Sequence, residues 1–408
     1  ALSKSVPTEL GKLTKVADEF LLAGNFFTGA IPSQLGQMSS LSKHFQAMAN
    51  LLSSTIPTQL GGLEKLDESF LIHQNRLSGT MPTQLGGFTS LKSYFSAGAN
   101  GLTGTVPSEF GLMTSLNSTA FWVGSNSLEG TLPTQLGQWS SVRTHFWVED
   151  NQLSGAVPTE LGRWSAFKTN LRLYNNSFCD DVPSEIAALS TLSSLFGDST
   201  ATQGNSFGTG CCQLSGTCAP SFVPTTIQSP TQSPTRFHTK APSFAPTTTQ
   251  PPTQSPTQSP TNATGNTLPL VDSGYDSLLD YGGQDYTGTI PTEFGLLTGA
   301  TGLYLSDNSL TGTLPTELGN MASLDDFFAI EDQVGAGLIT GELPTEFGKL
   351  AKLTQQFTVS RLALSKSVPT ELGKLTKVAD EFLLAGNFFT GAIPSQLGQM
   401  SSLSKHFQ

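Results

Sequence analysis

The chain has 408 residues, of which 12% are charged, and its formal net charge at pH 7 is −11. It carries no basic stripe that would neutralise phosphates, which argues against a nucleic-acid partner. It also contains no run of 18 apolar residues, so the sequence predicts no membrane span.

A pair formed by an apolar residue and Pro recurs through most of the chain. The first set steps by 25 residues, once by 26: Val6-Pro7, Ile31-Pro32, Ile56-Pro57, Met81-Pro82, Val106-Pro107, Leu132-Pro133, Val157-Pro158 and Val182-Pro183. The second set steps by 24, 29, 25 and 25: Ile290-Pro291, Leu314-Pro315, Leu343-Pro344, Val368-Pro369 and Ile393-Pro394. This period indicates stacked repeats, because one unit is too small to bury its own apolar face.

Each repeat contains the same two predicted elements. Apolar residues alternate before the anchor, as at Phe70 and Ile72, which predicts a short strand with one buried face. After each Pro they lie three or four apart, as at Leu60 and Leu63, which predicts a 3₁₀ or helical turn on the opposite side. An Asn six residues before most anchors is expected to satisfy backbone groups in the turn after the strand. These residues are Asn25, Asn50, Asn75, Asn100, Asn126, Asn151, Asn176, Asn308 and Asn387.

This pattern resembles the plant type of leucine-rich repeat, with its Leu-x-Gly-x-Ile-Pro-x-x-Leu-Gly signature, over about residues 1–200 and 275–408. The resemblance implies an α/β solenoid with short parallel strands on the concave face and 3₁₀ or helical turns on the convex face. The chain departs from the consensus by one inserted residue before the strand, and by Gln284, Gly337 and Leu362 at the Asn position. We expect irregular stacking there, most of all around the 29-residue step.

Two columns of strand residues are predicted to face outward on the concave side. Equivalent positions of successive strands stack about 4.8 Å apart, so residues of neighbouring repeats meet. We predict an exposed binding face for a sugar or an aromatic partner, formed by Trp122, Trp147, Arg172, Tyr174, Glu149 and Asp150. The alternative is that a neighbouring copy or a glycan covers the two indoles. Trp139 and Trp164 fall in the apolar column of the turns and are predicted to be core.

Hydroxyl side chains recur around the Pro anchors, as at Thr55, Thr80 and Thr105. A Thr lattice at strand spacing resembles that of ice-binding solenoids. The same residues are ordinary in plant-type repeats, so ice binding is a minor alternative.

Two kinds of covalent modification are predicted in the first repeat block and after it. Three sequons predict N-glycosylation at Asn117, Asn175 and Asn262. In a secreted chain, four cysteines predict a disulfide cap over the last repeat, with three connectivities open: Cys179, Cys211, Cys212 and Cys218. A metal site is the rival interpretation, but no Cys-x-x-Cys pair and no nearby His supports it. The sequence therefore predicts neither a metal nor a cofactor.

Residues 219–267 are rich in Pro, Thr and Ser. Because Pro fixes φ and lacks an N–H donor, this segment is predicted to be an extended polyproline-II-like linker that interrupts the solenoid. A bare disordered linker is the alternative. Dense Ser and Thr beside Pro predict O-glycosylation, at sites such as Thr231, Thr235, Thr253, Thr257 and Thr261.

The last 46 residues, 363–408, repeat residues 1–46 letter for letter. Both ends of the match cut through repeats, so we interpret the chain as a window on a head-to-tail array with a period of 362 residues. In this interpretation, 1–218 is the C-terminal part of one solenoid with its Cys-rich cap, and 268–408 is the N-terminal cap and first repeats of the next. A duplication introduced during assembly of the sequence is the alternative.

No catalytic constellation is visible. The five His belong to no Ser/His/Asp or metal-ligand set, and no Gly-rich phosphate loop follows a strand. We therefore predict a non-enzymatic, secreted glycoprotein whose tandem units bind one another and form an extracellular fibre or matrix, with an extracellular polysaccharide or protein as a further partner. The alternative is a recognition ectodomain whose Trp122 and Trp147 face binds a glycan or a peptide.

Overall fold

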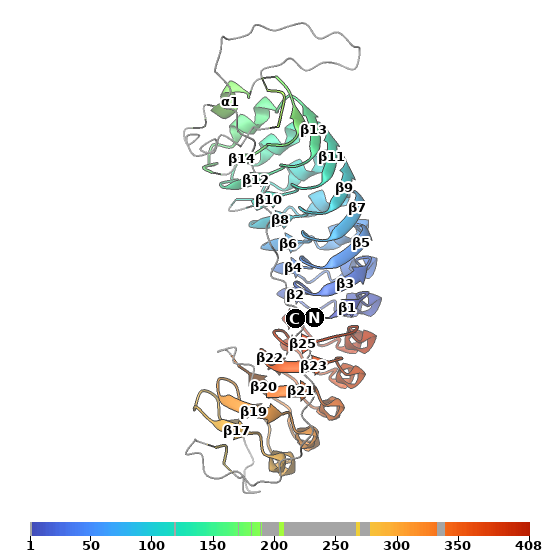
Figure 1. The fold of residues 1–408 in the computed structure, drawn as a ribbon, viewed down its shortest axis with the longest axis vertical. Coiled ribbons are helices and arrows are strands. Elements are labelled where there is room, and N and C mark those ends of the chain that lie inside the picture. The colour runs from blue at the N-terminus through green and yellow to red at the C-terminus, as the bar shows by residue number, and fades with distance from the viewer. Residues whose placement is uncertain are drawn as a thin grey trace, which may run out of the picture.

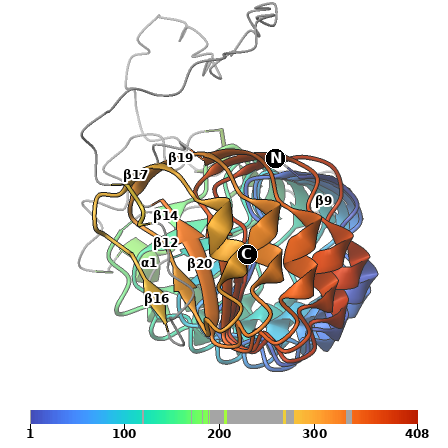
Figure 2. The same ribbon diagram turned by 90° about the horizontal axis from the view of Figure 1, so that it is seen from below.

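A computed structural model describes residues 2–117, 120–169, 171–180, 182–187, 189, 204–207, 267–269, 278–332 and 339–408. Within these ranges the chain is a curved solenoid of parallel strands and 3₁₀ turns (Figure 1). One sheet lines the concave side, and the turns form a ridge on the convex side, as Figure 2 shows from below. The predicted fold class is confirmed for these residues. None of their helices is long and apolar enough to cross a membrane.

The concave sheet has 13 strands in the described part of the chain, each formed by the segment with alternating apolar residues. In spatial order they are β14 (Leu171–Arg172), β12 (His145–Trp147), β10 (Ala120–Trp122), β8 (Tyr94–Ser96), β6 (Ser69–Leu71), β4 (His44–Gln46), β2 (Glu19–Leu21), β26 (His406–Phe407), β24 (Glu381–Leu383), β22 (Gln356–Ser360), β20 (Phe327–Glu331), β18 (Leu303–Tyr304) and β16 (Leu279–Asp280). All neighbouring pairs are parallel, as stacked repeats require.

A second row of strands follows the Asn positions. It forms an eight-stranded sheet of β1 (Ser3–Lys4), β3 (Phe26–Gly29), β5 (Leu51–Thr55), β7 (Arg76–Thr80), β9 (Gly101–Gly104), β11 (Ser127–Gly130), β13 (Gln152–Gly155) and β15 (Ser177–Phe178). A five-stranded sheet contains β17 (Thr287–Thr289), β19 (Ser309–Thr313), β21 (Ile339–Glu342), β23 (Ala363–Lys366) and β25 (Phe388–Phe389). Sequence patterning does not predict these strands, because each buries little more than one apolar residue, as β7 buries Leu77.

The Pro-anchored segments form the 3₁₀ turns. They are η1 (Thr8–Lys12), η2 (Ser33–Gln37), η3 (Thr58–Gly62), η4 (Thr83–Gly87), η5 (Ser108–Leu112), η6 (Thr134–Gln138), η7 (Thr159–Arg163), η8 (Thr292–Leu296), η9 (Thr316–Asn320), η10 (Thr345–Lys349), η11 (Thr370–Lys374) and η12 (Ser395–Gln399). The equivalent segment after Pro183 is a short α-helix, α1 (Ser184–Ala187). Each Pro sits just before its turn with φ near −65°, as Pro57 does, a value that the pyrrolidine ring fixes in advance.

The core lies between the concave sheet and the turns. Its centre is a column of side chains that are Phe from β12 to β20 and Leu in the outer strands β14, β18 and β16; in it Phe45 and Phe70 stack with centroids 5.4 Å apart. The turns contribute Leu, Met and aromatic side chains, including Trp139 and Trp164, which are buried as predicted. Their indole N–H groups donate to the carbonyl oxygens of Phe110 and Leu136, both at 2.9 Å.

The predicted Asn ladder is confirmed in the described repeats. The side chain of Asn75 donates to the carbonyl oxygens of Ala47, Ile72 and His73 at 3.0–3.3 Å and accepts from the Leu52 N–H at 3.0 Å. Each Asn thereby connects two repeats through buried backbone groups. Where the Asn is replaced, the outcomes differ. Leu362 is buried as an apolar residue, the Gln284 N–H donates to Asn308, and Gly337 lies outside the described residues.

The two repeat blocks meet directly. Strand β26 pairs with β2, with Glu19 opposite His406 and Phe20 opposite Phe407. The labels of both chain ends lie together at this boundary in Figure 1. We call it the seam. The assignment of 1–218 and 268–408 to successive solenoids remains a prediction.

Candidate functional site

The parallel register brings the predicted concave residues together. Trp122 of β10 lies opposite Trp147 of β12, which in turn lies opposite Arg172 of β14. The two indoles meet edge to face, with centroids 6.1 Å apart and planes at 79°. The Arg172 guanidinium lies over the Trp147 ring, 4.1 Å from its centroid, which is a cation–π contact. We call these three residues the Trp–Arg row.

Two glycines make room beside the Trp–Arg row. A Cβ atom at Gly98 would collide with the Trp122 ring, and one at Gly124 would lie 2.6 Å from the Glu149 carboxyl carbon. Gly98 and Gly124 lie in the outward column just after strands β8 and β10, one repeat before Trp122 and Glu149. The large side chains therefore fold down onto the backbone of the neighbouring repeat.

Because the side chains fold down, the face is less exposed than the sequence predicted. Trp122 and Trp147 are half-buried, and Glu149 is only 4% exposed. Glu149 was predicted to lie on the exposed face together with Asp150, but Gly124 leaves space for its carboxylate beneath the surface. Its Oε1 atom lies 3.9 Å from Arg172 Nη1, while Oε2 has no hydrogen-bond partner.

Burial raises the pKa of Glu149, because the ionised carboxylate loses solvation, although the nearby Arg172 opposes the shift. The Trp122 indole N–H also favours the ionised form, but it does not reach hydrogen-bond geometry with the carboxylate. Burial likewise raises the pKa of Tyr174, and the negative charge of Glu149 adds to this. Tyr174 therefore belongs to the same cluster as Glu149 and Arg172.

Several polar atoms in this region are enclosed without a hydrogen-bond partner: Trp122 Nε1, Trp147 Nε1, Glu149 Oε2, His73 Nδ1 and Ser96 Oγ. The His73 ring packs 5.0 Å from Trp122, centroid to centroid. Sequence reasoning missed His73 and Ser96, although both lie in the two outward columns that predicted the other residues. Small or uncharged side chains in these columns gave no chemical signal.

Asp150 occupies a different place from the rest of the predicted face. It is exposed, and its carboxylate accepts from Asn175 Nδ2 at 2.7 Å and from Ser125 Oγ at 3.4 Å. All three residues precede a ladder Asn and have left-handed backbone conformations, with φ between 50° and 55°. They form a polar edge beside the Trp–Arg row.

The predicted modification sites are only partly described. Asn175 is exposed at the polar edge, and Asn117 is half-buried before β10. Cys179 is disulfide-bonded. Cys211, Cys212, Cys218, Asn262 and all the predicted O-glycosylation sites lie outside the described residues. Glycosylation and the disulfide pairing stay predictions.

The hydroxyl lattice and metal binding have little geometric support. Thr58 donates to the neighbouring Gln59 side chain at 3.4 Å, and Thr159 donates to Glu160 at 3.4 Å. These two hydroxyls are thus paired locally, whereas Thr55, Thr80 and Thr105, which come before the Pro anchors, are exposed. Within the described ranges, no group of three or more His, Cys, Asp or Glu side chains is placed to hold a metal ion.

The chain is similar to several known proteins. A sequence profile described as Leucine Rich Repeat matches residues 301–321, about one repeat. The plant peptide hormone receptor RGFR1 in complex with RGF2 is 20% identical with a TM-score of 0.46, over 99% of this chain and 53% of that one. The ectodomain of the receptor kinase GASSHO1/SCHENGEN3 from Arabidopsis thaliana, in complex with CASPARIAN STRIP INTEGRITY FACTOR 2, is 23% identical with a TM-score of 0.43, over 99% and 46%.

A plant ice-binding protein is 18% identical with a TM-score of 0.34, over 83% of this chain and 76% of that one. The chain spans about half the length of the two receptor structures. A search of curated proteins finds no match. The profile match, the parallel strands with 3₁₀ turns and the Asn ladder together define a leucine-rich-repeat solenoid.

Proposed function

We propose that this chain is an extracellular recognition module that binds a peptide on the concave face around the Trp–Arg row. The observation that carries the proposal is the cluster of enclosed, unpartnered polar atoms on Trp122, Trp147 and Glu149. A buried donor or acceptor without a partner costs roughly 1–3 kcal/mol. Because these atoms are enclosed, a ligand recovers that free energy when the side chains turn outward and pair with it.

The chemistry of the cluster favours a peptide over a sugar. Sugars stack on open indole faces, but Arg172 covers a face of Trp147, and His73 packs against Trp122. The unpartnered indole N–H groups match peptide carbonyl oxygens, and Glu149 Oε2 matches an N–H donor. The side chain of Arg172 is 40% exposed, so it remains available to a carboxylate of the ligand.

The fibre hypothesis remains a prediction of a different kind. It concerns contacts between copies of the chain, whereas the Trp–Arg row lies on the concave sheet, several strands away from the seam. Both activities are compatible with one solenoid. Ice binding remains a minor hypothesis, because hydroxyls of the column after the Pro anchors, such as Thr58 and Thr159, are engaged with their neighbours.

Selection from a random-peptide display library tests the proposal. We expect enriched peptides to carry an acidic group, and their affinity, measured by calorimetry, to fall about thirty-fold or more in Trp147→Ala, as for a central aromatic anchor. Arg172→Gln, which keeps much of the side-chain volume, should lower the affinity for the same peptides. Leu71→Ala is the matched control, because Leu71 holds the same register position in β6.

Two outcomes contradict the proposal. The first is that no peptide is enriched, or that enriched peptides bind Trp147→Ala and Arg172→Gln as well as they bind the parent chain. The second is that an oligosaccharide array gives binding that depends on these two residues while peptides do not. Circular dichroism of each variant separates lost binding from lost folding.

A further inference from the structure

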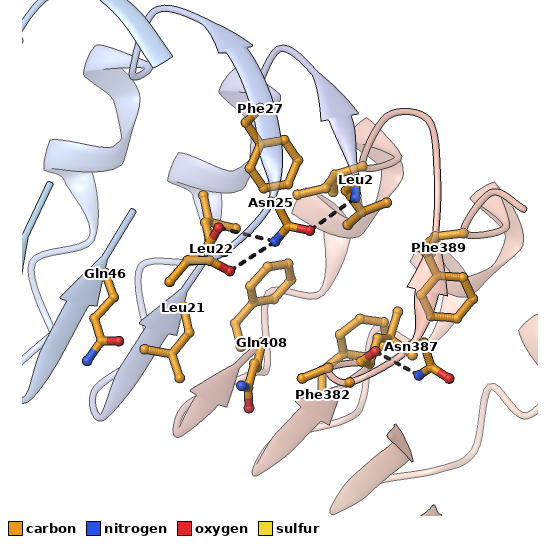
Figure 3. A pocket seen from close by; sticks show the side chains of 18 of the residues that line it. Leu2, Leu21, Leu22, Asn25, Phe27, Gln46, Phe382, Asn387, Phe389 and Gln408 are labelled. Atoms are coloured by element: carbon orange, nitrogen blue, oxygen red, sulfur yellow. Dashed lines mark hydrogen bonds between the residues drawn. The ribbon is translucent and has the colours of Figure 1, made fainter. Parts of the chain in front are cut away.

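The Trp–Arg row contains a cation in a column of neutral side chains. In the described strands from β2 to β14, Arg172 is the only charged residue among those that stack in register with it. Figure 3 shows two of the neutral members, Leu21 of β2 beside Gln46 of β4. An acidic group that lies along this column therefore meets its cation at Arg172.

The guanidinium of Arg172 is held in place without a close counter-ion. It lies 4.1 Å from the centre of the Trp147 ring, and its Nη1 atom lies 3.9 Å from Glu149 Oε1, which is beyond hydrogen-bond distance. Another Arg–Glu pair on the concave side, Arg361 with Glu331, is closer, at 3.2 Å. Because the Arg172 side chain is also 40% exposed, an anion from solvent can reach it.

The carboxylate of Glu149 has little besides Arg172 to stabilise its charge. Glu149 is buried, its Oε2 atom has no hydrogen-bond partner, and the backbone of Gly124 lies against its carboxyl group. Removing the counter-ion of a buried charge is strongly unfavourable. An anion that drew Arg172 away would therefore leave Glu149 in a state that favours protonation.

The groups that face Glu149 do not supply a second counter-ion. On the β14 side, Arg172 favours the ionised form, while Tyr174 stays neutral because burial and the charge of Glu149 both raise its pKa. The next residue, Asp150, is negative and disfavours ionisation. On the β10 side, the uncharged indole of Trp122 faces the carboxylate. Burial outweighs Arg172 already in the free chain, where the pKa of Glu149 is raised.

We propose that the Trp–Arg row is a proton-linked anion site, in which an acidic group of the ligand replaces Glu149 as the counter-ion of Arg172 and Glu149 takes up a proton from solvent. The complex then holds one cation, one ligand anion and one neutral carboxyl group, so no buried charge is left uncompensated. Proton uptake and anion binding strengthen each other by the same factor. The affinity for an acidic ligand therefore increases as the pH falls.

This inference rests on the proposed ligand binding at the Trp–Arg row and adds its regulation by pH. A small anion, methanesulfonate, tests it without a selected peptide, because a sulfonate stays ionised throughout the titration. Its binding is followed at constant ionic strength by tryptophan fluorescence, to which Trp147 beneath Arg172 contributes. We expect the dissociation constant to increase with pH by up to about ten-fold per unit, between the pKa of Glu149 in the free chain and its higher value in the complex.

Three variants, each checked by circular dichroism, separate the groups involved. Glu149→Gln imitates the protonated carboxyl group, so it should bind at every pH as tightly as the parent chain binds at the lowest pH. Arg172→Gln should lose binding at every pH. Glu129→Gln is the matched control, because it removes an exposed carboxylate on β11 and should keep the pH dependence of the parent chain.

Several results overturn the proton link. They are an absence of anion binding to the parent chain, an affinity that does not change with pH, an equal pH dependence in Glu149→Gln, and binding that survives in Arg172→Gln. Failure of the proton link is distinguishable from failure of peptide recognition. Selected peptides whose affinity depends on Trp147 but not on pH would support recognition and refute the link.

Discussion

At the residue scale, the size of a neighbour one repeat away decides what each concave side chain can do. Glu149 and Trp122 were both expected on an open face, yet Gly124 and Gly98 let them sink against the backbone. The result is a carboxylate that is 4% exposed and two indole N–H groups without partners. The chemistry of a side chain on this face therefore depends on the residue about 25 positions earlier in the sequence.

Substitution of the buried carboxylate gives a pH-dependent prediction. The folded-state pKa of Glu149 is raised above its ordinary value of 4.5, so the folded chain binds this proton more tightly than the unfolded chain. Stability from this group is therefore lost as pH rises from near 4.5 through the folded-state pKa. We expect Glu149→Gln to raise the melting temperature at pH 7 and to have little effect near pH 4, measured by calorimetry.

The exposed carboxylate of Glu129, on β11, provides the control. Glu129→Gln should leave the melting temperature nearly unchanged at both pH values, as most surface substitutions do. If Glu149→Gln destabilises the chain more at pH 7 than at pH 4, the attraction to Arg172 outweighs the cost of burial, and our account of this carboxylate is wrong.

At the element scale, the sequence predicts much of the repeat but not all of it. Alternating pairs such as Phe70 and Ile72 locate the concave strands, and Pro with Leu at fixed spacing locates the turns, since both patterns reflect burial on one face. The second row of strands escapes prediction because hydrogen bonding, not burial, forms it. The positions of Trp122 and Arg172 in one row followed from the register, but their burial depended on packing between repeats.

The glycine in each 3₁₀ turn sets how closely the repeats stack, and η4 offers an adjacent pair to test this. A Cβ atom at Gly86 would lie 2.7 Å from the carbonyl carbon of Glu109, whereas one at Gly87 would lie 3.5 Å from its nearest neighbour, the Gly61 oxygen. We expect Gly86→Ala to cost about 1–3 kcal/mol in the free energy of unfolding, since the next repeat must shift. Gly87→Ala should be neutral or slightly stabilising, because it reduces the freedom of the unfolded chain.

Urea unfolding of both variants measures the difference. The comparison is matched in position, turn and substitution, so it isolates the contact with the next repeat. Equal stabilities of the two variants would show that the turns separate without cost, which contradicts close stacking as the reason for this glycine.

At the scale of the whole molecule, the concave sheet continues across the seam, although no peptide bond joins the two blocks there. The concave sheet passes from β26 to β2 although these strands lie at opposite ends of the sequence. Stability of a solenoid is approximately a sum of repeat stabilities and contacts between neighbours. The seam therefore contributes one neighbour term of its own, and the chain that joins the two blocks adds covalent proximity to it.

Cutting the tether measures that neighbour term. A site-specific protease sequence placed within 219–267 separates the two blocks after cleavage, and all four cysteines stay with the first block if the site follows Cys218. We expect the cleaved halves to sediment as one complex at concentrations of about 1 μM, which corresponds to about −8 kcal/mol of association.

Phe407→Ala should release the two halves, because truncating this fully packed ring at the seam removes about 3–5 kcal/mol. Phe95→Ala, in the same ring column but four strands from β26, should leave the halves associated. Independent sedimentation of the cleaved parent halves would mean that proximity alone, and not complementary repeat surfaces, brings β26 onto β2.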